Sequence, residues 1–295
     1  MNQILKGIVC ATITPFTPEG TLDRQSIRSL CRYLIDAGIH ALYPLGTNGE
    51  GILLSSRDRK AAAEIILKEV QRQIPVVIQC GAATTEEAVE LARHAAVVKA
   101  DGIGIMTPFF FPQDEEAVIA YFSKVAAAAS ELPMYAYNIP GFTNNDLLPA
   151  WVEKIAKLAP NFAGVKYSAP NLIRLTEYMK AVPSAGVLIG CDRLILPALS
   201  LGAAGTVSGP AMAFPHLFVG LWNAFQRKEL DLARTLQSRL VDLDNALADF
   251  PAVPLLKELL RHKGVITCSL PRGPLRSLNN RESARLDSII EEFTR

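Results

Sequence analysis

The chain has 295 residues, and its 30 Lys and Arg against 29 Asp and Glu give a formal net charge of +1. This balance gives no electrostatic reason to expect nucleic acid or an acidic membrane as a partner. No apolar run reaches the ~18 residues of a membrane span. The N-terminal stretch MNQILKGIVCATITPF lacks the features of a signal peptide. The five cysteines are scattered without a CxxC pair, which favours a reduced, cytoplasmic chain.

Short apolar runs rich in β-branched residues recur along the chain, and each is followed by a helical pattern. The runs are near-continuously apolar, as expected for parallel strands covered on both faces. They span 7–16, 41–46, 75–82, 102–108, 133–140, 162–168, 186–192 and 204–211. Stretches 22–38, 55–71 and 84–100 have helical patterns, and the last two begin with a hydroxyl cap and acids in the first turn.

Eight strand–helix units predict an α/β fold, the (β/α)₈ TIM barrel, which typically needs ~250 residues. The competing architecture is an open doubly wound sheet, but no GxGxxG follows the first strand. After residue 213 only helical stretches remain, at 214–230, 231–247, 253–264 and 281–293. We therefore predict a catalytic barrel over 1–228 and a C-terminal helical region, packed on the barrel, over 229–295. The apolar surface of that region, unless it packs on the barrel, predicts a homo-oligomer.

Lys166 stands in the apolar stretch GVKYS at the C-terminal end of the sixth predicted strand, where barrel active sites lie. The strand period places Gly164 and Lys166 on one side and Val165 and Tyr167 on the other. If that side faces the axis, Gly164 leaves room beside the lysine. One interpretation is a lysine paired with a buried carboxylate. We favour the other, because no acid adjoins it in sequence: an amine whose pKa is lowered by desolvation and which forms a Schiff base with a ketone.

Other polar groups follow neighbouring strands. Tyr137 ends the fifth predicted strand, where its phenol is either a proton carrier or an ordinary core tyrosine. The turn GTNGEG, 46–51, has glycines whose exposed N–H groups can bind a carboxylate or phosphate. It lacks the GK[ST] ending of a Walker A loop. The four histidines are dispersed and no HExxH or GxSxG motif is present, so we expect no metal site.

The stretches GTNGEG, YNIP and GVK, in this order and with TPF near the start, together resemble the dihydrodipicolinate synthase/N-acetylneuraminate lyase family over most of the chain. Members are (β/α)₈ barrels, usually homotetramers, that join or split pyruvate and an aldehyde through a lysine Schiff base. They need no metal or organic cofactor. The resemblance implies a pyruvate-dependent aldolase or lyase whose partners are a small 2-keto acid and an aldehyde, with no nucleic acid and no membrane.

The resemblance also implies roles for single residues. Lys166 would form the imine with pyruvate, Tyr137 would transfer protons, and Thr47 would hydrogen-bond that tyrosine. Asn48, at a position that is usually Thr or Ser, would hold the pyruvate carboxylate. The backbone carbonyl of Val207 would lie beside the pyruvate unit.

The departures from the family pattern concern the second substrate. Phe142 stands where synthases that use aspartate semialdehyde have an arginine, and Phe110 stands where many members have a tyrosine donated across a subunit interface. Both count against a synthase of lysine biosynthesis. YNIP is similar to the lyase branch, whose loop after strand 7 carries an Asp and a Glu that bind sugar hydroxyls. Here these positions are Asp192 and Arg193, and a positive charge suits an acidic group on the aldehyde portion.

The predicted substrate site is completed by residues at the ends of the sixth and seventh strands, Ser168 and Gly190. Three functions stay open. The first is a lyase or aldolase, N-acetylneuraminate lyase-like or 2-keto-3-deoxy acid aldolase-like, on a keto acid whose distal half is not a neutral polyol. The second is 4-hydroxy-tetrahydrodipicolinate synthase (dihydrodipicolinate synthase) or a related dehydratase. The third is a catalytically inactive ligand-binding barrel, which the missing loop tyrosine favours and the combination of Lys166, Tyr137 and Thr47 opposes.

Overall fold

Each apolar run predicted as a strand contains one in the computed structural model, which describes residues 4–294. Residues 1–3 of the N-terminal stretch and residue 295 lie outside the described part. The strands are β1 Gly7–Cys10, β2 Ala41–Leu42, β3 Val77–Gln79, β4 Gly102–Met106, β5 Met134–Asn138, β6 Phe162–Tyr167, β7 Gly186–Ile189 and β8 Gly205–Ser208. They are shorter than the apolar runs because most runs continue into the loop that follows the strand.

The eight strands form one parallel sheet in the order β2-β1-β8-β7-β6-β5-β4-β3. Its two end strands also meet, through a parallel bridge between Leu42 and Val76 and a hydrogen bond from the Gln79 amide to the Pro44 carbonyl (3.2 Å). The sheet therefore closes into a barrel. The prediction of a (β/α)₈ TIM barrel is confirmed, and the open doubly wound alternative is wrong.

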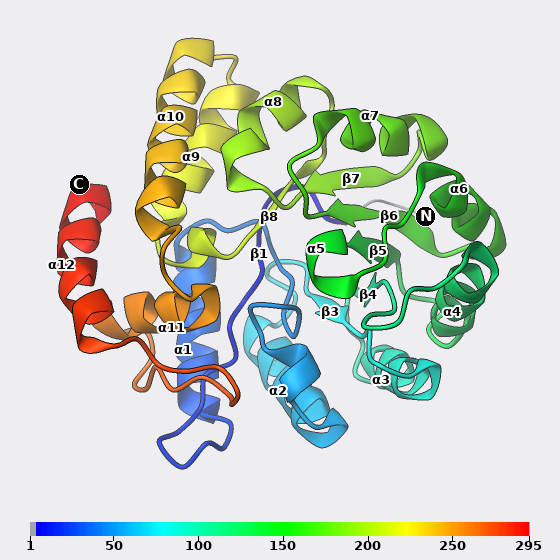
Figure 1. Ribbon diagram of the computed structural model, residues 1–295, viewed down its shortest axis with the longest axis horizontal. Coiled ribbons are helices and arrows are strands. Elements are labelled where there is room, and N and C mark those ends of the chain that lie inside the picture. The colour runs from blue at the N-terminus through cyan, green and yellow to red at the C-terminus, as the bar shows by residue number, and fades with distance from the viewer. Residues whose placement is uncertain (1–3, 295) are drawn as a thin grey trace.

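Helices separate the strands and surround the barrel (Figure 1). They are α1 Arg24–Asp36, α2 Ser56–Val70, α3 Thr85–Val97, α4 Glu115–Ala127, α5 Pro140–Thr143, α6 Pro149–Leu158, α7 Leu172–Ala181, α8 Ile195–Ser200 and α9 Pro215–Gln226. Single turns of 3₁₀ helix are η1 Gly51–Leu53, η2 Asp192–Leu194 and η3 Pro210–Met212. The predicted caps are present, since the side chains of Ser55 and Thr84 accept hydrogen bonds from the amides of Asp58 and Glu87. A capped first turn satisfies amides that have no partner within the helix.

The predicted C-terminal helical extension consists of α10 Leu230–Leu247, α11 Ala252–His262 and α12 Asn280–Thr294. The three helices gather on one side of the barrel, near α1 and α9 (Figure 1). The ring of Phe293 on α12 meets that of Phe214, which precedes α9, with centroids 6.2 Å apart. The boundary at residue 228 falls in the turn between α9 and α10, and the division into two regions stays a prediction. Within residues 4–294, no helix combines the length and the apolar character needed to cross a bilayer.

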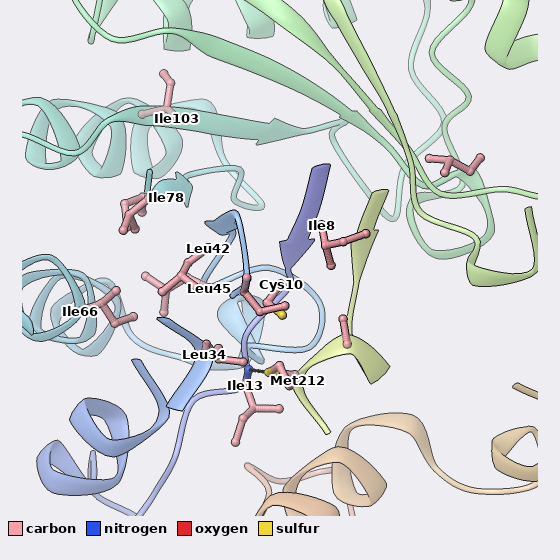
Figure 2. Packing of buried hydrophobic residues seen from close by; sticks show 14 of the residues in the cluster. Ile8, Cys10, Ile13, Leu34, Leu42, Leu45, Ile66, Ile78, Ile103 and Met212 are labelled. Atoms are coloured by element: carbon pink, nitrogen blue, oxygen red, sulfur yellow. Dashed lines mark hydrogen bonds between the residues drawn. The ribbon is translucent and has the colours of Figure 1, made fainter. Parts of the chain in front are cut away.

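The core has two layers, as the alternation of side chains in a barrel strand requires. On β1, Ile8 and Cys10 face the helices and belong to the larger outer layer, whereas Val9 points into the barrel. Figure 2 shows part of the outer layer, where Leu34 of α1 and Ile66 of α2 gather with residues of the strands and loops.

The N-terminal end of the barrel is filled by Tyr135 of β5. Its buried phenol oxygen accepts hydrogen bonds from the amides of Ile4 and Leu5, both at 3.0 Å. Gly164 of β6 lies beside this ring: a Cβ there would be 2.8 Å from the ring and 2.1 Å from the carbonyl oxygen of Gly186. The space at Gly164, which the sequence suggested as room beside Lys166, is therefore taken by Tyr135 and β7.

Replacing Gly164 by alanine should lower stability by about 1–3 kcal/mol, because the new methyl group meets backbone atoms that cannot rotate away. Thermal unfolding followed by circular dichroism checks this. The matched control is Gly141→Ala, where a Cβ would have no atom within 4 Å, and it should leave the midpoint unchanged within a degree or two. Equal midpoints for the two variants would contradict the packing described here.

Candidate active site

Lys166 lies at the end of β6, 3% exposed. Its Nζ is 3.7 Å from the ring centroid of Tyr137 and 4.5 Å from that of Tyr43, and Tyr43 belongs to the inner layer of the core. Val165 and Tyr167 belong to the outer layer. The lysine therefore points into the barrel, as the period of the strand predicts.

Burial lowers the pKa of Lys166, and the neighbouring Tyr137 opposes part of that shift. Among the described residues, no carboxylate forms an ion pair with it; the fully buried lysine that does is Lys257, which pairs with Glu50 at 2.5 Å. Of the two interpretations of Lys166, the structure supports the desolvated amine. An amine with a lowered pKa has a larger neutral fraction, and the neutral form is the nucleophile.

Tyr137 and Thr47 join this lysine from neighbouring parts of the barrel. Tyr137 is opposite Lys166 in the pairing of β5 with β6 and is 2% exposed. Its phenol oxygen is 3.3 Å from the hydroxyl oxygen of Thr47, which lies in the turn after β2. The three residues predicted to carry catalysis are thus brought together, with the ring of Tyr43 as a neighbour that sequence reasoning missed.

The turn 46–51 has a tight backbone that few residues other than glycine allow. A Cβ on Gly49 would lie 2.7 Å from the Leu45 amide nitrogen, and the Gly49 carbonyl accepts a hydrogen bond from the Thr14 hydroxyl (2.7 Å). Asn48 donates to the Ala11 carbonyl (3.4 Å) and lies against Gly209, where a Cβ would come within 2.4 Å of its amide nitrogen. Asn48 therefore contacts β1 and the end of β8, and its role in holding a carboxylate stays a prediction.

The remaining predicted residues at the ends of β6, β7 and β8 form a second group. Val207 is buried in the inner layer. The Ser208 hydroxyl donates to a carboxylate oxygen of Asp192 (2.8 Å). Ser168 packs against the backbone of Gly190, since a Cβ there would lie 2.1 Å from its hydroxyl oxygen. Burial raises the pKa of Asp192 to about 7, and the hydrogen bond from Ser208 opposes the rise.

Arg193 is exposed and bound to α10, where it donates to Asp244 and, at 2.6 Å, to Asn245. The same helix holds the loop after β7 through Gln237, which accepts from the Leu196 amide (2.7 Å) and donates to the Asp192 carbonyl (3.0 Å). Neither contact could be anticipated from the sequence, because α10 follows the loop by some forty residues. Binding of an acidic substrate group by Arg193 stays a prediction, and it requires release from Asp244.

The loops after β4 and β5 carry three exposed aromatic side chains, called the aromatic rim: Phe110, Phe111 and Phe142. Phe110 and Phe142 are 75% and 76% exposed. Asn145, which sequence reasoning missed, joins the two loops: its amide nitrogen donates to the carbonyls of Pro108 and Phe111, both at 2.9 Å, and its oxygen accepts from the Gln113 amide (2.7 Å).

No cluster of three or more His, Cys, Asp or Glu suited to a metal ion occurs within residues 4–294.

Comparison with known proteins shows the family to which this chain belongs. The family model described as "Dihydrodipicolinate synthetase family" matches residues 4–293. The chain belongs to the dihydrodipicolinate synthetase family. This confirms the resemblance seen in the sequence to the family of pyruvate-dependent class I aldolases that includes N-acetylneuraminate lyase.

Individual relatives of this family member cover nearly its whole length. An uncharacterised DapA-like lyase of Halobacterium salinarum is 36% identical over 98% of this chain and 94% of its own. A 4-hydroxy-tetrahydrodipicolinate synthase of Geobacter sulfurreducens is 30% identical, with 98% and 99% covered. YagE of Escherichia coli, described as a putative 2-dehydro-3-deoxy-D-gluconate aldolase, is 31% identical, with 99% and 98% covered. Its crystal structure in complex with pyruvate superposes with a TM-score of 0.94 at 30% identity, covering 99% of each chain.

The Asp192 carboxyl should titrate with a midpoint of about 7, far above an ordinary aspartate, because burial disfavours its charged form. Ser208→Ala should raise the midpoint further, since the hydrogen bond it removes stabilises the carboxylate. Carbon-13 NMR of labelled aspartate checks both statements, with Asp192→Asn to assign the signal. A midpoint near 4 in the unaltered protein would contradict the described environment.

Proposed function

We propose that this family member is a pyruvate-dependent aldolase or lyase that reversibly cleaves or forms a 2-keto acid through a Schiff base on Lys166. The observation that carries the proposal is the placement of the Lys166 amine: buried, without a carboxylate partner, and against the ring of Tyr137. A ligand-binding barrel has no need of an amine kept in this state.

The proposed chemistry begins when the neutral Lys166 amine adds to the keto carbon of pyruvate. Loss of the carbonyl oxygen as water leaves an iminium, and the phenol of Tyr137, hydrogen-bonded to Thr47, supplies and removes the protons of these steps. The iminium draws electrons from the methyl carbon, whose lost proton leaves an enamine that attacks the aldehyde carbon. In the cleavage direction the substrate hydroxyl gives its proton to Tyr137, the electrons of the breaking carbon–carbon bond flow into the iminium, and the aldehyde leaves. Protonation of the resulting enamine and addition of water then release pyruvate from Lys166.

The pyruvate carboxylate would lie at the turn 46–51, with Asn48 as donor and the carbonyl of Val207 beside the pyruvate unit. The glycines of this turn leave backbone N–H groups available to an anion. YagE, which resembles this chain over its whole length, was crystallised with pyruvate, and this likeness supports pyruvate as the first substrate.

For the second substrate we propose an aldehyde without a carboxylate, as produced from a 2-keto-3-deoxy acid. Phe142 offers no cation at the predicted position of the synthase arginine, and Arg193 is already bound to Asp244. The pairing of Arg193 opposes the expectation of an acidic aldehyde. Asp192, held by Ser208, is left to accept hydrogen bonds from substrate hydroxyls.

The second candidate function is 4-hydroxy-tetrahydrodipicolinate synthase, which uses the same imine chemistry. Several relatives bear this name, among them the Geobacter protein at 30% identity over 98% of this chain. Phe142 opposes it, because the site then lacks the cation that would hold the carboxylate of aspartate semialdehyde.

We also propose that the protein is a homo-oligomer, a tetramer or a dimer. Phe110, Phe111 and Phe142 are each more than half exposed, and the rings of Phe110 and Phe111 pack on each other with centroids 4.9 Å apart. Large aromatic side chains gathered at one rim are typical of a surface that a partner covers.

Incubation with pyruvate and borohydride should add one reduced pyruvate unit irreversibly, and Lys166→Ala should abolish this gain in intact mass. The chain contains its own control, because the other buried lysine, Lys257, is held by Glu50 and should carry no label in peptide mapping. A label on Lys257, or none anywhere, would contradict the proposed role of Lys166.

2-Keto-3-deoxy sugar acids should be cleaved at least about tenfold more efficiently than aspartate semialdehyde is condensed with pyruvate, since one desolvated, unmatched carboxylate costs on the order of 1–3 kcal/mol. Lactate dehydrogenase coupling measures cleavage, and dihydrodipicolinate reductase coupling measures condensation. Phe142→Arg should lower the ratio of cleavage efficiency to condensation efficiency, because the new cation improves condensation. Preference for aspartate semialdehyde in the unaltered enzyme would favour the second candidate function.

A further inference from the structure

The turn that carries Thr47 is tied to the C-terminal region by a buried ion pair. Glu50 belongs to this turn, and its carboxylate lies 2.5 Å from Nζ of Lys257 on α11, with both side chains fully buried. The backbone of Glu50 is left-handed, with φ of 56°, a conformation that is uncommon for residues other than glycine. A surrounding contact must hold such a backbone in place.

Both partners of the pair have further contacts that fix their position. The carboxylate of Glu50 also accepts a hydrogen bond from the amide of Arg272. The ammonium of Lys257 donates to the Leu270 carbonyl (2.9 Å) and lies 4.0 Å from the ring centroid of Phe16. The pair therefore joins three segments: the turn after β2, helix α11, and the chain that follows α11, which crosses α1 in the view of Figure 1.

Helix α11 supports the same turn at a second place. A Cβ on Gly209 would meet Asn48 of the turn at 2.4 Å and Leu256 of α11 at 2.9 Å, so these side chains converge on the end of β8. Next to it, Met212 accepts a hydrogen bond from the Ile13 amide (3.4 Å), the dashed line in Figure 2. Within the turn, Glu50 thus contacts α11, whereas Thr47 contacts Tyr137.

We propose that Glu50 and Lys257 are positioning residues of the active site. Their ion pair anchors the turn 46–51 to α11 and so holds the Thr47 hydroxyl at hydrogen-bonding distance from Tyr137. This inference rests on the proposed function for its catalytic consequence, because the Thr47–Tyr137 contact matters only if Tyr137 moves protons. Misplacement of a catalytic contact by about 1 Å can cost on the order of 100-fold in rate.

The test removes both charges at once, since a single substitution leaves a buried charge unpaired and can prevent folding. In Glu50→Gln with Lys257→Met, the amide oxygen at 50 still accepts from Arg272. We expect a thermal midpoint within a few degrees of that of the unaltered protein. The amide hydrogens at positions 50 and 51 should exchange at least about tenfold faster than in the unaltered protein. Both amides are hydrogen-bonded within the turn, to Thr47 and Gly46, so their exchange reports on the turn itself.

Catalysis provides the second readout. The double variant should lose about tenfold in kcat, while borohydride trapping at saturating pyruvate still reaches completion. In a Thr47→Val background, the same double substitution should change kcat little, because the contact it positions is already gone. The matched control is the exposed pair between α4 and α6, Glu115→Gln with Lys154→Met, which should affect neither readout.

Unchanged exchange and unchanged kcat in the double variant would overturn the inference and leave the pair a purely structural role. An equal loss of kcat with and without Thr47 would also overturn it, because the pair would then act on some other group. If the double variant does not fold, Glu50→Gln with Lys257→Leu is measured, which also removes both charges and keeps the amide oxygen that accepts from Arg272. Absence of pyruvate labelling in the unaltered protein would refute the proposed function, and exchange at Glu50 and Gly51 would still decide whether the pair anchors the turn.

Discussion

Burial of the Lys166 amine without a compensating carboxylate is the constraint on which the site depends. An ammonium ion loses most of its hydration in such a place, and the protein can respond either by pairing the charge or by releasing the proton. The chain contains one buried lysine with a carboxylate partner and one without. Lys257 is paired with Glu50, whereas Lys166 lies against the rings of Tyr43 and Tyr137. Two buried lysines therefore have different electrostatic surroundings, and the difference lies in their neighbours.

The fold was largely predictable because its signals are local. Each strand of a barrel is covered on both faces and reads as an apolar run, and each helix has its own period and cap, as the hydroxyls of Ser55 and Thr84 show. Closure could be inferred only from the number of units. The contact that closes the sheet includes the bridge between Leu42 and Val76 and the hydrogen bond between Gln79 and Pro44, and nothing in the sequence of these short strands marks it.

The candidate site was predictable where residues stand at strand ends, because parallel strands place all those ends on one side. Lys166, Tyr137 and Thr47 follow from this rule together with the family motifs. What the sequence could not supply are contacts between segments far apart in the chain. From the sequence, Arg193 was expected to be available to a substrate, but in the structure it pairs with Asp244 of α10. Tyr43 lies within the apolar run 41–46, and nothing in the sequence marks it as a neighbour of the amine, because that place depends on the curvature of the barrel.

Tyr135, whose phenol oxygen accepts hydrogen bonds from the amides of Ile4 and Leu5, fills the end of the barrel opposite the Lys166 amine. In the proposed reaction, both reactants would therefore reach the amine from the C-terminal ends of the strands. The keto acid, joined to Lys166, would be in place before the aldehyde arrives, and after cleavage the aldehyde would depart first.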